Sequence, residues 1–190
     1  KDNLQLFWDN YYKDIKDDGP KQKVLWVPSG WMPDGQGISF KNRYTENCYN
    51  KNGTCMKIGF SAAHAKLGWV GIYWLPLIGD TGSWQGPGIN VYNKLEINKN
   101  VPVKLTFLAR GEDGGERINF KVGGVGDGDD SIAFPLETGW KSLKKTWTKY
   151  EIPLTGEDLS NVVGAFSWFA SKEQNPDKTR LWFYLDEIKF

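Results

Sequence analysis

The chain has 190 residues, and its 24 basic and 23 acidic side chains leave a formal net charge of +1. That length suits one domain with a sizeable core, and we predict a single domain over 1–190, with 1–20 as a loosely attached lead-in. The charge balance gives no cationic footprint for nucleic acid, and no apolar run approaches the roughly 20 residues that cross a bilayer.

Short strand-like segments follow one another along the whole chain, separated by Gly, Pro, Asn and Asp. They are rich in β-branched and aromatic residues and cover 23–27, 37–41, 54–60, 69–75, 103–110, 117–122, 148–153, 163–170 and 181–190. The stretch 156–160 reads as one helical turn. Strands without alternating helices predict an all-β fold, an antiparallel β-sandwich or jelly roll.

Two cysteines lie on either side of a turn signal near the start of the chain. Cys48 and Cys55 flank the pair Asn52-Gly53, which favours a tight hairpin turn and brings the two Cα atoms within bonding reach. We predict a disulfide between them, and therefore an oxidising compartment. Two free thiols beside a turn are the alternative.

The segment 69–75 is apolar on both faces. Trp69 and Tyr73 project to one side of the strand, about 13 Å apart, and Trp74 projects to the other. Leu105 and Phe107, by contrast, alternate with polar neighbours, as expected of a strand with one wet face. A strand with two apolar faces is buried on one side and offers rings to a ligand or a covering loop on the other.

Ten tryptophans are more than a core of this size needs, so we expect some to be exposed. The loop after the aromatic strand carries Trp84 and Gln85 toward the rim of the same site. Exposed rings suit a flat apolar ligand surface, and sugar rings, nucleobases and Pro-rich peptides are the main candidates. If the ligand is a sugar, we expect Trp69, Tyr73 and Trp84 to stack on its rings and Gln85 and Arg110 to bind its hydroxyl groups.

The order of these motifs resembles secreted bacterial carbohydrate-binding modules with the galactose-binding-like jelly roll. The residues that carry the resemblance are 28–32, the loop between Cys48 and Cys55, 68–74, 108–116 and the closing segment 181–188. The resemblance implies noncatalytic binding of a polysaccharide or oligosaccharide, by a monomeric module of a larger secreted or cell-surface protein.

The same resemblance implies a structural calcium ion near the two ends of the chain. Asp186 matches the acidic position of the last strand, and Asp9 is the N-terminal contributor, while Glu187 stands where a second Asp is common. Calcium prefers six to eight oxygen ligands, which carboxylates and carbonyls of two chain ends can supply.

Two other interpretations stay open. A structural or adhesion module would use the same aromatic residues to bind a protein. A glycoside hydrolase would need two carboxylates flanking the bond, and Glu112 and Glu116 are the most suggestive pair. They flank a turn, however, which favours a polar hairpin end with Glu116 paired to Arg110. The only histidine, His64, has no nucleophile elbow beside it.

Overall fold

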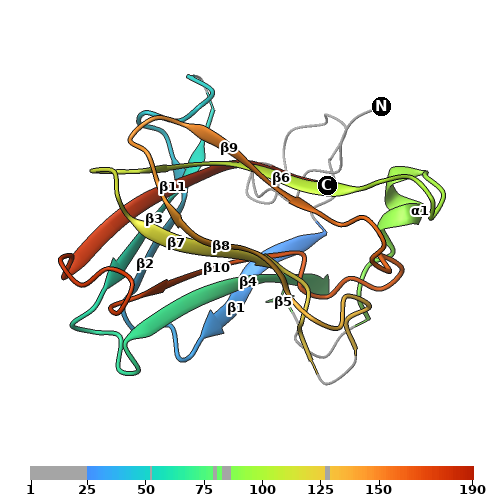
Figure 1. Ribbon diagram of the computed structural model, residues 1–190, viewed down its shortest axis with the longest axis horizontal. Helices are drawn as coiled ribbons and strands as arrows, with labels where there is room; N and C mark the ends of the chain where they lie inside the picture. The colour runs from blue at the N-terminus through green and yellow to red at the C-terminus, as the bar shows by residue number, and fades with distance from the viewer. Residues whose placement is uncertain (1–24, 52, 79–80, 83–86, 127–128) are drawn as a thin grey trace.

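Two antiparallel sheets pack face to face in the computed structural model, which describes residues 25–190 except 52, 79–80, 83–86 and 127–128 (Figure 1). The first sheet has the order β1-β4-β10-β7-β8, with β5 paired to β4, and the second has the order β2-β3-β11-β6-β9. The first comprises β1 (Trp26–Met32), β4 (Trp69–Ile78), β5 (Thr81–Gly82), β7 (Arg117–Val122), β8 (Leu136–Ser142) and β10 (Phe166–Ser171). The second comprises β2 (Ile38–Tyr44), β3 (Cys55–Ser61), β6 (Lys104–Gly111), β9 (Thr148–Pro153) and β11 (Arg180–Lys189).

The predicted all-β antiparallel sandwich is confirmed, and side-chain alternation explains how its core forms. On β6 the side chains of Leu105, Phe107 and Ala109 are buried between the sheets, while their neighbours point outward. Phe107 meets Phe120 of β7 across the core, with ring centroids 4.6 Å apart. Each strand thus buries one apolar face. The removal of these faces from water is the main contribution that holds the two sheets together.

The side chains of the aromatic strand β4 alternate between the two sides of the first sheet, as its sequence indicates. Trp74 is completely buried and packs edge-on against Phe166, with ring centroids 5.1 Å apart. Trp69 and Tyr73 lie on the opposite, outer side of the first sheet, which β4 shares with its neighbours β1 and β10. Of the described tryptophans, the fully buried ones are Trp26, Trp74 and Trp168, whereas Trp31, Trp69, Trp140, Trp147 and Trp182 keep part of their surface accessible.

Three local features differ from the prediction. The edge strand β8 is missing from the predicted set, since Gly139 at φ +66° interrupts its alternation. The five-residue helix α1 (Val91–Leu95) is also missing, although Asn90 caps it through a side-chain bond to the backbone of Asn93. The helical turn predicted at 156–160 is wrong. There Leu159 is buried and bonds to α1, accepting from the amide of Val91 and donating to the hydroxyl of Tyr92.

The predicted disulfide is confirmed. Cys48 and Cys55 are bonded, with their Cα atoms 5.5 Å apart, and the amide of Gly53 donates to the carbonyl of Asn50 within the loop. Both cysteines pack against Tyr184 of β11. The bond therefore fixes the loop 48–55 to the outer side of the second sheet.

Within the described residues no helix is long and apolar enough to span a membrane.

Candidate functional site

The predicted site residues do not converge on one surface. Trp69 and Tyr73 belong to the outer side of the first sheet, whereas Arg110 lies on the outer side of the second, next to the inward-facing Ala109 of β6. The hydrophobic core separates these two surfaces (Figure 1). Trp84 and Gln85 lie outside the described residues. One glycan chain lying on Trp69 therefore cannot also reach Arg110 across the core.

An aromatic platform, formed by Trp69 and Phe169, covers the outer side of β4 and β10. The ring centroids are 5.9 Å apart and the planes are inclined by 36°. Phe169 pairs with Gly71 across the strands, and a Cβ atom at Gly71 would lie 2.9 Å from the Phe169 ring. The glycine therefore lets this ring settle closely over β4. Sequence analysis missed Phe169, although the inward positions of its neighbours Phe166, Trp168 and Ala170 imply that it points outward.

Tyr73 requires a correction to the predicted platform. Its side chain is only 6 % exposed and packs with Leu75, Val125 and Val163, which cover it. Its hydroxyl donates to the carbonyl of Gly123, 3.2 Å away, and its burial raises the pKa of that hydroxyl. The ring meets Phe169 edge-on, with centroids 5.9 Å apart. Tyr73 thus packs beside Phe169 on the same side of the sheet, and its buried ring offers no face to a ligand.

Polar groups of β7 and β8 border the platform. The ammonium group of Lys121 lies 4.7 Å from the Phe169 ring centroid and 3.5 Å from a carboxylate oxygen of Glu137. Asn119 donates from its side-chain amide to the same carboxylate. The amide oxygen of Asn119 is buried and accepts no hydrogen bond within the described part of the chain. A ligand rich in hydroxyl groups requires hydrogen-bond donors and acceptors beside an apolar surface such as the aromatic platform.

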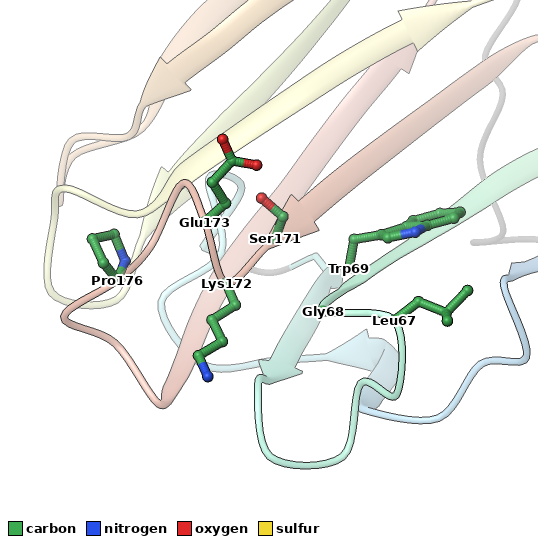
Figure 2. Close-up of a pocket in the computed structure, with 7 residues that line it drawn as sticks. All are labelled: Leu67, Gly68, Trp69, Ser171, Lys172, Glu173 and Pro176. Atoms are coloured by element: carbon green, nitrogen blue, oxygen red, sulfur yellow. The ribbon is translucent and has the colours of Figure 1, made fainter.

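A cavity of about 480 Å³ opens at the Trp69 end of the platform. Figure 2 shows the Trp69 indole and the Ser171 hydroxyl next to each other at the ends of β4 and β10, with Leu67 on one side and Glu173 on the other. The amide of Lys172 donates to the carbonyl of Gly68, 2.8 Å away. This backbone hydrogen bond joins the segment after β10 to the segment before β4. The volume is in the range of ligand pockets.

On the outer side of the second sheet the protein's own cations lie over several rings. The guanidinium carbon of Arg110 lies 3.8 Å from the ring centroid of Tyr184 and 5.5 Å from that of Trp147. Tyr184 is almost fully buried, and its hydroxyl donates to Glu112. Burial, followed by the hydrogen bond to Glu112, raises the pKa of Tyr184 to about 12. The Tyr184 ring is therefore less available for stacking than Trp69.

Because its pKa is raised, the ionisation of Tyr184 reports on the outer side of the second sheet. Its contribution to stability is complete below its ordinary pKa of 10.0 and is lost as the pH rises from there through about 12, because the unfolded chain ionises first. We expect the tyrosinate absorbance titration to contain a late step that Tyr184→Phe removes, together with part of the alkaline loss of stability. An identical titration of the variant would contradict this assignment.

The predicted calcium ligands are only partly described. Asp186 is 4 % exposed, and one of its carboxylate oxygens accepts from the amide of Glu187. The pairing of β11 with β6 shifts register between Asp186 and Lys189, where Glu187 has φ +51°. Among the described residues, no group of three or more acidic, histidine or cysteine side chains comes together that could hold a metal ion. Asp9 lies outside the described residues.

The two glutamates considered for catalysis make structural contacts. Glu116 is completely buried, accepts from the amide of Asp113, and lies 3.9 Å from Lys178, so its predicted pairing with Arg110 is wrong. Glu112 accepts from Tyr184. The ring of His64 lies 2.9 Å from the hydroxyl of Ser61 in an exposed turn, and within the described residues no carboxylate completes a triad.

No protein-family model matches the sequence, and no match was found among curated proteins. Solved structures are similar in three dimensions. A family 30 carbohydrate-binding module superposes with a TM-score of 0.60 at 13 % identity, over 98 % of this chain and 86 % of that one. The chain has the β-sandwich fold of this module.

Two further modules come from Clostridium thermocellum. The family 30 module of a cellulosomal cellulase gives a TM-score of 0.59 at 12 % identity, over 98 % of this chain and 95 % of that one. A family 11 module, solved with a β-1,3-1,4-mixed-linked tetrasaccharide, gives 0.54 at 15 % identity, over 100 % of this chain and 96 % of that one. At these identities the similarity establishes the architecture, and the ligand has to be argued from the site.

Proposed function

We propose that this protein binds a polysaccharide or oligosaccharide, without catalysis, on the outer side of its first sheet. The observation that carries the proposal is the aromatic platform of Trp69 and Phe169 beside an open cavity. An apolar aromatic surface of this kind accepts the C–H face of a pyranose ring. The carbohydrate-binding modules that share the fold support the same ligand class.

Direction and specificity would come from the groups around the platform. Lys121 can donate to sugar hydroxyls, and Glu137 can accept from them. Hydrogen bonds to charged groups are the stronger ones, so this edge would fix the orientation of the sugar ring. Trp84 and Gln85 remain predicted contributors at the rim. Tyr73 and Gly71 would act by holding Phe169 in place.

The test is electrophoresis of the purified chain through gels that contain one polysaccharide each, with an array of soluble glycans to find the best oligosaccharide. A glycan-binding protein migrates more slowly in the gel with its ligand, and added free oligosaccharide restores its mobility. An adhesion module that binds protein would migrate alike in every gel. Unchanged mobility across neutral β-glucans, xylans and mannans would refute the proposed function.

A structural calcium ion at Asp186 remains a prediction, with Asp9 as the second ligand. An ion that binds only the folded state stabilises it by mass action, so EDTA should lower the melting temperature by roughly 5 to 10 °C. Asp186→Asn should melt at the lower temperature with or without EDTA. An unchanged melting curve, together with no calcium by elemental analysis, would count against the site.

A further inference from the structure

A line of cationic side chains crosses the outer side of the second sheet. Strand pairing places Lys41 of β2 opposite Lys57 of β3, Lys57 opposite Tyr184 of β11, and Tyr184 opposite Arg110 of β6. All four project away from the core, because their neighbours along each strand point into it. At the usual separation of strands this cation row spans about 14 Å.

Aromatic rings fix two of these cations in position. The ammonium group of Lys57 lies 4.9 Å from the ring centroid of Tyr44 and 5.2 Å from those of Trp182 and Tyr184. Arg110 stacks on Tyr184 and approaches Trp147. Cation–π contacts of this kind hold the side chains without neutralising their charge. Lys57 and Arg110 are therefore held in position before any ligand arrives.

The described residues balance the charge of the row only in part. Glu112 lies 3.9 Å from Lys57, but within the described residues no carboxylate lies within ion-pair distance of Lys41 or Arg110. Lys41 and Lys57 also face each other directly, and like charges in that position destabilise a sheet. An anion bound along the row would remove both costs.

Aromatic side chains extend the row at its Arg110 end. Trp147 donates from its indole N–H to the carbonyl of Asn47, and Tyr49, which is 57 % exposed, meets its ring edge-on at 6.4 Å. Tyr49 belongs to the loop that the disulfide closes. Rings and cations together suit a chain that carries both pyranose rings and carboxylates. A nucleic acid duplex is less suited, because it needs a broader positive surface than a protein of net charge +1 offers.

We propose that the outer side of the second sheet is a second binding site, for a uronate-containing polysaccharide. Its carboxylates meet Lys41, Lys57 and Arg110, and its sugar rings lie toward Trp147 and Tyr49. This site is independent of the aromatic platform, because the core separates the two surfaces. One protein molecule can then hold an acidic and a neutral glycan chain at the same time.

The experiment uses gels that contain polygalacturonate, alginate, or polygalacturonate whose carboxyl groups are methyl-esterified. The wild-type protein should be retarded by at least one of the two acidic polymers, not by the esterified one, and less as salt is added, because salt screens exposed charges. Lys41→Ala combined with Arg110→Gln should weaken this binding at least ten-fold. Lys94→Ala on α1, which like Lys41→Ala removes one positive charge but lies elsewhere, should not change it.

The outcomes separate this site from the proposed function. Trp69→Ala should leave acidic-glycan binding intact and weaken neutral-glycan binding, whereas the double variant should do the reverse. The side chain of Lys41 is exposed, so Lys41→Ala alone should leave packing and the melting temperature unchanged. It should give a smaller loss of acidic-glycan binding than the double variant. The second site is refuted if neither acidic polymer retards the protein, if the esterified polymer or duplex DNA binds equally well, or if Trp69→Ala abolishes the acidic binding.

Discussion

Replacing Trp69 with alanine is expected to weaken binding of the best neutral glycan at least ten-fold while leaving the fold intact. The indole forms one half of the aromatic platform and borders the cavity at its end. Stacking on one aromatic side chain contributes about 1 to 3 kcal/mol, by analogy with bases, and each 1.4 kcal/mol is about ten-fold in affinity. Isothermal titration with the glycan selected from the array measures this loss.

Trp31 provides the matched control. It is 40 % exposed on β1 and packs edge-on against Phe40, away from the aromatic platform. Trp31→Ala should keep the affinity of the wild-type protein, whereas Phe169→Ala should lose affinity as Trp69→Ala does. Full affinity in both platform variants would place the site elsewhere and remove the main support for the proposed function.

Replacing Trp74 with alanine is expected to lower the free energy of unfolding by about 3 to 5 kcal/mol, the usual range for truncating a large buried aromatic residue. Its ring is completely buried against Phe166. The indole N–H has no acceptor within the described residues, so the loss comes from packing and from the cavity left behind. Urea unfolding followed by fluorescence and circular dichroism gives the value.

Trp69 and Trp74 belong to the same strand and differ in the face that they occupy, so the two alanine variants test opposite predictions. Trp74→Ala should reduce stability and keep its glycan affinity at temperatures where it is folded. Trp69→Ala should do the opposite. A stability loss below about 1 kcal/mol for Trp74→Ala would contradict its place in the core, because even modest core truncations cost about that much.

The sequence by itself determined the features that depend on neighbouring residues. Alternation along 103–110 and 117–122 correctly separates inward from outward side chains, because the period of a strand is two. The short spacing around a turn predicts the bond between Cys48 and Cys55. The division of the aromatic strand into Trp69 on one side and Trp74 on the other follows from the same period.

Only the tertiary structure decided which of these faces meet. Pairing of β4 with β10 brings Phe169 over Gly71, and packing of Val125 and Val163 buries Tyr73, although these residues are far apart in the sequence. Placement of β6 in the second sheet separates Arg110 from Trp69. Strand order and loop cover depend on long-range contacts throughout the core, and a local period of two carries no information about them.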